Sequence, residues 1–152
     1  RRRFEIKGIK NDIMVVDDYA HHPTEVSATL QAARNGWNRR IIAVFQPHLY
    51  SRTKDFHKEF AAAFMNSDIL VITDIYPARE LPIKGVNGEL VYNSARSIGH
   101  KNVHYVPNIE NIKECLDGQV KSNDMIITIG AGTIWRYGQA YFEHLKNLRA
   151  TN

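Results

Sequence analysis

Val15-Val16-Asp17-Asp18-Tyr19-Ala20-His21-His22-Pro23-Thr24-Glu25-Val26 is the stretch that decides the predicted fold. It begins in an apolar run, passes through two carboxylates, a tyrosine and two histidines, and reaches a proline that suits the first position of a helix. A buried strand is therefore predicted to end at the two aspartates. Open α/β folds bind ligands at the carboxyl ends of their strands, so the polar side chains that follow are candidates for a binding site.

The rest of the chain repeats this alternation of apolar strand and amphipathic helix. A tight turn at 10–12 predicts an opening hairpin, and helical crossovers predict that the other strands are parallel. We therefore expect an α/β fold with a Rossmann-like open sheet of about six mostly parallel strands, one antiparallel edge strand and helices on both faces. Strands are predicted at 4–9, 13–16, 39–45, 68–73, 102–106 and 125–129, and helices at 23–35, 52–65, 87–98, 108–116 and 134–148.

Composition narrows the class of protein. The chain has 152 residues, 43% of them hydrophobic, which suits one soluble globular domain. The single cysteine, Cys115, cannot close an internal disulfide, so we expect a cytoplasmic protein. No apolar run is long enough to cross a bilayer, and the net charge of +4 comes from scattered residues rather than from a basic stripe interleaved with aromatics. We therefore expect neither a membrane nor a nucleic acid as a partner.

Two features of the opening stretch have competing interpretations. His22 and Glu25 invite a metal interpretation, but zinc-protease motifs place two histidines four residues apart inside a helix, and His21 and His22 both precede the proline. We therefore predict no metal site.

Asp17 and Asp18 could cap the next helix or contact a ligand. Because successive strand residues face opposite sides, only one of them should point into the ligand crevice. The functional interpretation is stronger for Asp18, but the sequence does not decide which of the two does so.

A second polar loop, 46–53, follows the strand that ends at Phe45 and should lie at the same edge of the sheet. Arg52 is its natural anion contact, because a guanidinium can hold a carboxylate or a phosphate with two hydrogen bonds. The alternative is a surface arginine, although a cation at the start of a helix opposes the helix dipole. Ser51 is predicted to be the N-cap of that helix.

The remaining loops at this edge are less specific. Asp74, Tyr76 and Glu80 follow the strand at 68–73 and could serve as ligand contacts or as turn and cap residues. The run 130–132, Gly-Ala-Gly, is similar to the start of a dinucleotide fingerprint, but Trp135 stands where the third glycine belongs, so a structural turn is an equal alternative. No Gly-x-x-x-x-Gly-Lys-Ser/Thr loop occurs, so a triphosphate would have to be held by another part of the protein.

Four motifs occur in the order found in the Mur ligases, and the chain resembles the C-terminal domain of that family. They are DDYAHHPTE at 17–25, FQPHLYSRT at 45–53, DIYPARE at 74–80 and GAG at 130–132. The resemblance covers almost the whole chain. It implies that residues 1–152 are one domain of a longer enzyme, with the N-terminal UDP-sugar domain and the central ATP domain absent from this sequence. Arg1-Arg2-Arg3 fits the linker that precedes this domain.

Among the Mur ligases, the pattern is most similar to those that add L-alanine to UDP-N-acetylmuramate in peptidoglycan precursor synthesis. The resemblance implies ATP and Mg²⁺ as cofactors, an acyl phosphate made from the muramoyl carboxylate, and attack by the amine of L-alanine. The implied partners are the two substrates and the other domains of the same protein.

The same resemblance implies roles for individual residues, none of them catalytic. Asp18 would contact the nucleotide. Tyr19 and His21 would lie beside the amino acid, and Arg52 would bind its carboxylate. Supporting positions are implied for His22 and His48.

Two alternatives stay open at this stage. A murein-tripeptide recycling ligase shares this domain, although the loop at 76–83, YPARELPI, favours the alanine ligase. A non-catalytic nucleotide- or anion-binding module is the alternative from a different class. One departure from the family pattern is Leu49, where some relatives carry a basic residue, so the carboxylate would depend more heavily on Arg52.

Overall fold

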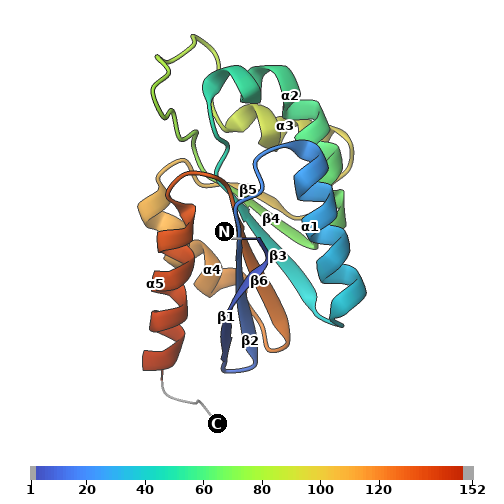
Figure 1. Ribbon diagram of the computed structural model, residues 1–152, viewed down its shortest axis with the longest axis vertical. Helices are drawn as coiled ribbons and strands as arrows, with labels where there is room; N and C mark the ends of the chain where they lie inside the picture. Colours follow the sequence, from blue (N-terminus) through green and yellow to red (C-terminus); the bar gives the residue numbers. More distant parts are fainter. Residues whose placement is uncertain (1–2, 149–152) are drawn as a thin grey trace.

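A six-stranded sheet forms the centre of the structure, a computed structural model that describes residues 3–148 (Figure 1). The strands lie in the order β1-β2-β6-β3-β4-β5. β1 pairs with β2 antiparallel, and all other neighbours are parallel. The bounds are β1 (Glu5–Lys10), β2 (Ile13–Asp18), β3 (Arg40–Phe45), β4 (Ile69–Ile72), β5 (Val103–Tyr105) and β6 (Asp124–Ile129). The predicted mostly parallel sheet with one antiparallel edge strand is confirmed.

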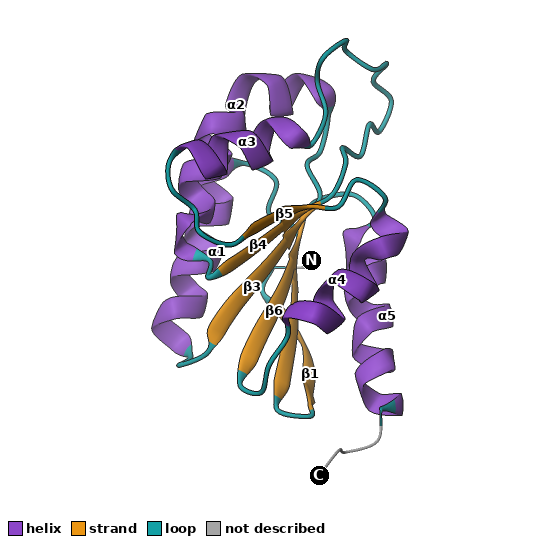
Figure 2. Cartoon of the chain, turned by 180° about the vertical axis from the view of Figure 1, so that it is seen from behind, coloured by secondary structure: helices purple, strands orange, loops and turns teal. Residues whose placement is uncertain are grey.

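Helices cover both faces of the sheet, as predicted. α1, α2 and α3 lie on one face, and α4 and α5 lie on the other (Figure 2). The bounds are α1 (Pro23–Gly36), α2 (Tyr50–Ala63), α3 (Glu89–Ser97), α4 (Ile112–Gln119) and α5 (Ile134–Asn147), with short 3-10 turns at Phe64–Asn66 and Ile109–Asn111.

The alternation of side chains along β2 between the two faces of the sheet explains why the sequence Ile13 to Val16 is continuously apolar. Met14 and Val16 pack into the core under α1, α2 and α3, whereas Ile13 and Val15 pack into the core under α4 and α5. A strand covered on both faces needs apolar residues at every position. The same alternation sends the side chains of the two aspartates that end the strand to opposite faces.

The start of α2 differs from the prediction. Ser51 was predicted to be the N-cap, but the helix begins at Tyr50, and Leu49 occupies the N-cap position with a φ of 76°. Ser51 therefore lies inside the first turn, where its hydroxyl donates a hydrogen bond to the carboxylate of Glu80. The prediction was wrong because the cap of this helix comes from a distant loop rather than from the adjacent sequence.

Other boundaries shift by a few residues. The helix predicted at 87–98 is confined to Glu89–Ser97, and the one predicted at 108–116 divides into a 3-10 turn followed by α4. Asn108 caps that turn by accepting a hydrogen bond from Glu110 N–H (3.0 Å).

The described chain begins at Arg3, so the linker predicted at Arg1 and Arg2 lies outside the described residues. Arg3 Nε lies 3.5 Å from Asp18 Oδ1, and the ring of Phe4 stacks on that of Trp37 at 5.0 Å. Within residues 3–148, no helix is both long and apolar enough to cross a membrane.

Candidate amino-acid carboxylate site

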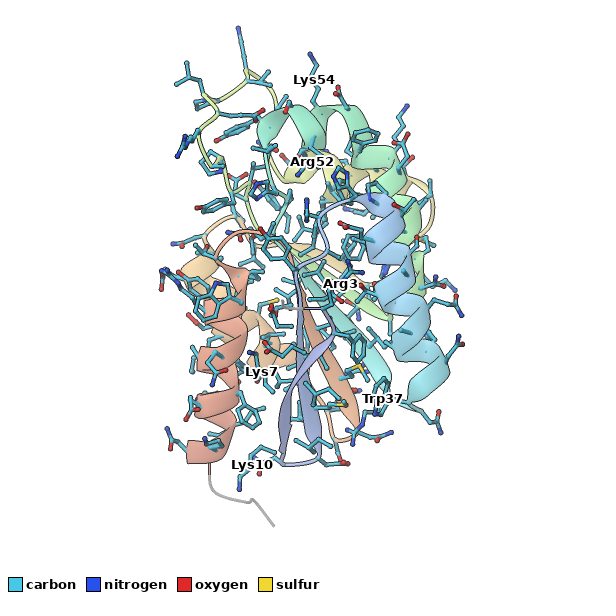
Figure 3. All side chains as sticks on the ribbon, viewed as in Figure 1. Arg3, Lys7, Lys10, Trp37, Arg52 and Lys54 are labelled. Carbon is cyan, nitrogen blue, oxygen red and sulfur yellow. The ribbon has the colours of Figure 1, made fainter. Side chains whose placement is uncertain are left out.

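The loops after β2, β3, β4 and β6 meet at the carboxyl edge of the sheet. Figure 3 shows Arg52 at this end of the molecule and Lys10 at the opposite end. Beyond the strands, His48 and Tyr76 form one further parallel bridge. Tyr76 N–H donates to Pro47 O (2.8 Å), and Leu49 N–H donates to Tyr76 O (2.9 Å). The loops after β3 and β4 are therefore joined through their backbones.

Five rings from three loops gather at this edge. The ring centroids of Tyr19 and His21 lie 5.4 Å apart, and those of His21 and His22 lie 4.9 Å apart. His21 is 6.0 Å from His48, whose ring stacks on Tyr76 at 5.5 Å. The structure thus brings together four of the residues for which the resemblance implies a role and Tyr76, which the sequence left as either a ligand contact or a turn residue.

Two nitrogens at this edge lack hydrogen-bond partners among residues 3–148. Nη1 of Arg52 and Nδ1 of His48 are buried and have no hydrogen-bond partner within the described part of the chain. Buried polar atoms without partners are uncommon, because each forfeits the hydrogen bonds that it would make to water. We call these two nitrogens the anion clamp, since a carboxylate or a phosphate would satisfy a guanidinium N–H and a neighbouring imidazole together.

The electrostatics of the edge also favour an anion. Burial, followed by the positive charges of Arg52 and His21, lowers the pKa of His48. Burial and then Arg52 likewise lower the pKa of His22. Histidine pKa values fall when the cationic form is desolvated or lies near another cation. A bound anion would relieve this repulsion.

Asp18, predicted to reach the nucleotide, already has internal partners. Its carboxylate accepts hydrogen bonds from Phe4 N–H, Ala20 N–H and the hydroxyl of Thr29, all at 2.9 Å. The side chain is only 2% exposed. Asp18 thereby fixes β1, the opening loop and α1 relative to one another. Its contact with a nucleotide stays a prediction.

Asp17 points to the other face, where its Oδ1 accepts a hydrogen bond from the hydroxyl of Thr128 (2.7 Å). Both carboxylates are buried. Thr29 was not predicted to have a polar role, although a hydroxyl among the apolar positions of α1 was a signal for one.

The glycine-rich turn before α5 is a structural turn. Oε1 of Gln46 accepts hydrogen bonds from the N–H groups of Thr133 (2.8 Å) and Ile134 (3.0 Å), which caps the helix. A Cβ at Gly132 would lie 2.6 Å from Tyr76 Cγ, so the turn packs tightly under the aromatic ring. The N-terminus of α5 is therefore occupied by protein groups, which favours the structural alternative over a dinucleotide site.

Asp74 and Glu80 serve as cap residues. Oδ1 of Asp74 accepts hydrogen bonds from Ile75 N–H (2.9 Å) and Gly88 N–H (3.0 Å), just before α3. Oε1 of Glu80 accepts one from Ser51 N–H (3.0 Å) in α2. Within residues 3–148, no three His, Cys, Asp or Glu side chains gather in a way that could hold a metal ion.

A comparison with known proteins places these features in a family. The family described as "Mur ligase, glutamate ligase domain" matches residues 2–132. The UDP-N-acetylmuramate–L-alanine ligase of Geotalea uraniireducens (strain Rf4) is 51% identical over 145 residues, which are 95% of this chain and 32% of that protein. The chain thus spans about a third of the length of this relative.

Solved structures share the fold. The UDP-N-acetylmuramate-alanine ligase of Thermotoga maritima has a TM-score of 0.79 and 28% identity, with 96% of this chain and 30% of that chain covered. A murein peptide ligase from Psychrobacter arcticus 273-4 also has a TM-score of 0.79, at 23% identity, with 99% of this chain and 31% of that chain covered. That second similarity concerns the fold alone. Since the family match covers most of the chain, the protein belongs to the Mur ligase C-terminal domain family.

Proposed function

We propose that this chain is the C-terminal domain of an ATP-dependent ligase that joins L-alanine to UDP-N-acetylmuramate in peptidoglycan precursor synthesis. In this proposal an N-terminal domain holds the UDP-sugar, a central domain holds ATP and Mg²⁺, and the present domain holds the amino acid. The name of the relative at 51% identity supports the choice of substrates. The observation that carries the proposal is the anion clamp, two buried nitrogens without partners in the described chain.

The clamp suits the α-carboxylate of an amino acid. Arg52 would hold one carboxylate through its guanidinium, and Nδ1 of His48 would donate a second hydrogen bond in the matching tautomer. Because the pKa of His48 is lowered, its ring is neutral at physiological pH in the absence of a ligand. The ring of His21 lies 6.0 Å from that of His48 and 5.4 Å from that of Tyr19, and the bulk of Tyr19 and His21 would favour a side chain as small as a methyl group.

ATP, when bound, supplies the phosphoryl group that activates the muramoyl carboxylate. The residues of this chain fit a triphosphate poorly. Both oxygens of Asp18 accept internal hydrogen bonds, Gln46 occupies the N-terminus of α5, and the sequence lacks a phosphate loop. We therefore assign ATP and Mg²⁺ mainly to the central domain, with a contact from Asp18 only after domain closure.

The task of this domain is to orient the amine and to exclude water. An activated acyl group is hydrolysed unless the nucleophile is held close and bulk water is kept away. A domain that binds the amino acid and then closes over the other two provides both. A cytoplasmic location belongs to this proposal, and the single half-buried cysteine suits a reducing compartment.

A substrate panel on the full-length protein that carries this domain tests the proposal. Release of ADP and phosphate is measured with UDP-N-acetylmuramate and either L-alanine or the murein tripeptide. We expect turnover with L-alanine and little with the tripeptide. Turnover with the tripeptide alone would assign the recycling reaction instead. An absence of ligation with both would leave only a binding module.

A further inference from the structure

Glu80 reaches from the loop after β4 to the first turn of α2. Its Oε1 accepts a hydrogen bond from Ser51 N–H (3.0 Å), and its Oε2 accepts one from the hydroxyl of Ser51. A carboxylate at this end of a helix also interacts favourably with the helix dipole. Leu49, at the N-cap position, has no side-chain acceptor. Glu80 therefore caps the helix in place of the residue that normally does so.

The segment between the two halves of the anion clamp is strained. Leu49 has a φ of 76°, a region that residues with a Cβ seldom adopt. Such a conformation persists only where the surrounding structure enforces it. Here, two backbone hydrogen bonds join Pro47 and Leu49 to Tyr76, and the Tyr76 ring stacks on His48. The free energy cost of the strained backbone is therefore offset by contacts from the loop after β4.

Residues 76–80, which we call the brace, thus hold residues 48–52 at two points. Tyr76 holds His48 and Leu49, and Glu80 holds Ser51. Within the brace, Glu80 N–H donates to Pro77 O (2.9 Å), so a tight turn fixes the distance between the two points.

We propose that Glu80 is a positioning residue for Arg52 and that the brace holds the two nitrogens of the anion clamp in position for the amino-acid carboxylate. This inference deepens the proposed function and rests on it. Arg52 directly follows Ser51, so the cap fixes the turn from which the guanidinium extends. The carboxylate of Glu80 is engaged by Ser51, whereas Nη1 of Arg52 is without a partner in the described chain. Glu80 holds the arginine without occupying its ligand position.

Substitution of Glu80 in the full-length ligase tests the role. Glu80→Ala should raise the KM for L-alanine about tenfold, because the uncapped turn no longer fixes Arg52 and part of its charge-assisted contact is lost. The KM for ATP should be unchanged. Glu80→Gln keeps an oxygen for Ser51 N–H and an amide that can donate to the hydroxyl, so its KM should stay within about threefold of wild type. Glu59→Ala, an exposed glutamate later in α2, is the matched control and should leave both constants unchanged.

Two further readouts separate positioning from general damage. Hydrogen exchange at the Ser51 amide of the 152-residue chain should accelerate in Glu80→Ala and not in Glu59→Ala. In an Arg52→Ala background, Glu80→Ala should raise the KM for L-alanine no further, because the two residues act through one contact.

The outcomes distinguish this inference from the function on which it rests. If Arg52→Ala leaves the KM for L-alanine unchanged, the proposed carboxylate site is wrong. If Arg52→Ala raises that KM but Glu80→Ala does not, only the role of Glu80 is wrong. The role of Glu80 is also overturned if Glu80→Ala raises the KM for ATP equally, or if Glu80→Gln is as impaired as Glu80→Ala.

Discussion

Replacing Gly132 with alanine should destabilise the domain, because the turn before α5 has no room for a methyl group. The new Cβ would lie 2.6 Å from Tyr76 Cγ, 2.9 Å from Tyr76 Cβ and 2.7 Å from Gln46 Oε1. The two Tyr76 atoms are close to the backbone and cannot swing away as a flexible chain end could. Gln46 Oε1 is the acceptor that caps α5. Either the cap or the ring beside His48 must move.

The size of the effect follows from these two contacts. Overpacking a tightly packed site costs about 1–3 kcal/mol. Weakening a helix N-cap costs about 0.5–2 kcal/mol. Because a shift of Tyr76 relieves part of the first cost, we expect the free energy of unfolding to fall by about 2–3 kcal/mol.

Urea unfolding of the 152-residue chain, followed by circular dichroism, measures this change. Gly118→Ala is the matched control. A Cβ at Gly118 meets no atom of the described residues within 4 Å, and the residue lies inside α4, so alanine should raise stability by up to about 1 kcal/mol. The two substitutions should therefore have opposite signs. A Gly132→Ala variant within about 0.5 kcal/mol of wild type would refute the packing argument.

Four other outcomes are expected. Asp18→Asn replaces an oxygen that accepts internal hydrogen bonds and should lower the free energy of unfolding by about 2 kcal/mol. Asp55, in α2, is exposed, so Asp55→Asn should have no effect, and equal effects of the two variants in the urea assay would contradict this prediction. Tyr141→Phe removes the hydrogen bond to Asp117 (2.8 Å) and should cost about 1 kcal/mol in the same assay, and an unchanged midpoint would count against that bond. Burial lowers the pKa of His100 below 6.5, so the unfolded chain binds the proton first and the free energy of unfolding should fall as the pH drops below 6.5. His100→Gln should make the free energy of unfolding less dependent on pH, and a wild-type urea midpoint that does not change with pH would disprove this expectation. The 152-residue chain alone should show no ATP-dependent ligation in a product assay, and detectable product would overturn the assignment of ATP to another domain.

The sheet could be predicted because its central strands, β2, β3, β4 and β6, are buried on both faces. The apolar runs that end at Val16, Phe45 and Ile129 do not alternate between polar and apolar residues, and helical segments separate these runs in the sequence. The direction of the strands then placed the polar loops at one edge, which brought Tyr19 and His48 into one cluster as expected.

The cap of α2 could not be predicted, because it depends on a contact across 29 positions. Local pattern favoured Ser51, a preferred cap residue, yet Glu80 performs that function from the loop after β4. The sequence allowed two interpretations of Glu80, as a ligand contact or as a cap residue. Only the contact between residues 48–52 and 76–80 in the structure shows that Glu80 is a cap residue.

The internal role of Asp18 was hidden for a similar reason. Strand alternation indicated that Asp17 and Asp18 face opposite sides, and the structure agrees. It did not indicate that Thr29 and the backbone of Phe4 would close over the carboxylate. The three hydrogen bonds to the buried Asp18 carboxylate stabilise the fold. A ligand contact formed on domain closure would come in addition to them.

The most direct test of the proposed function is the kinetics of Arg52→Ala in the full-length protein that carries this domain. Loss of a charge-assisted contact to the carboxylate should raise the KM for L-alanine by about 10–100-fold and change the KM for ATP and for the UDP-sugar by less than about twofold. Arg52→Lys should restore only part of the loss, since an ammonium cannot form the two-pronged contact. Equal increases in all three constants, or no increase for L-alanine, would contradict the claim that this domain holds the amino acid through Arg52.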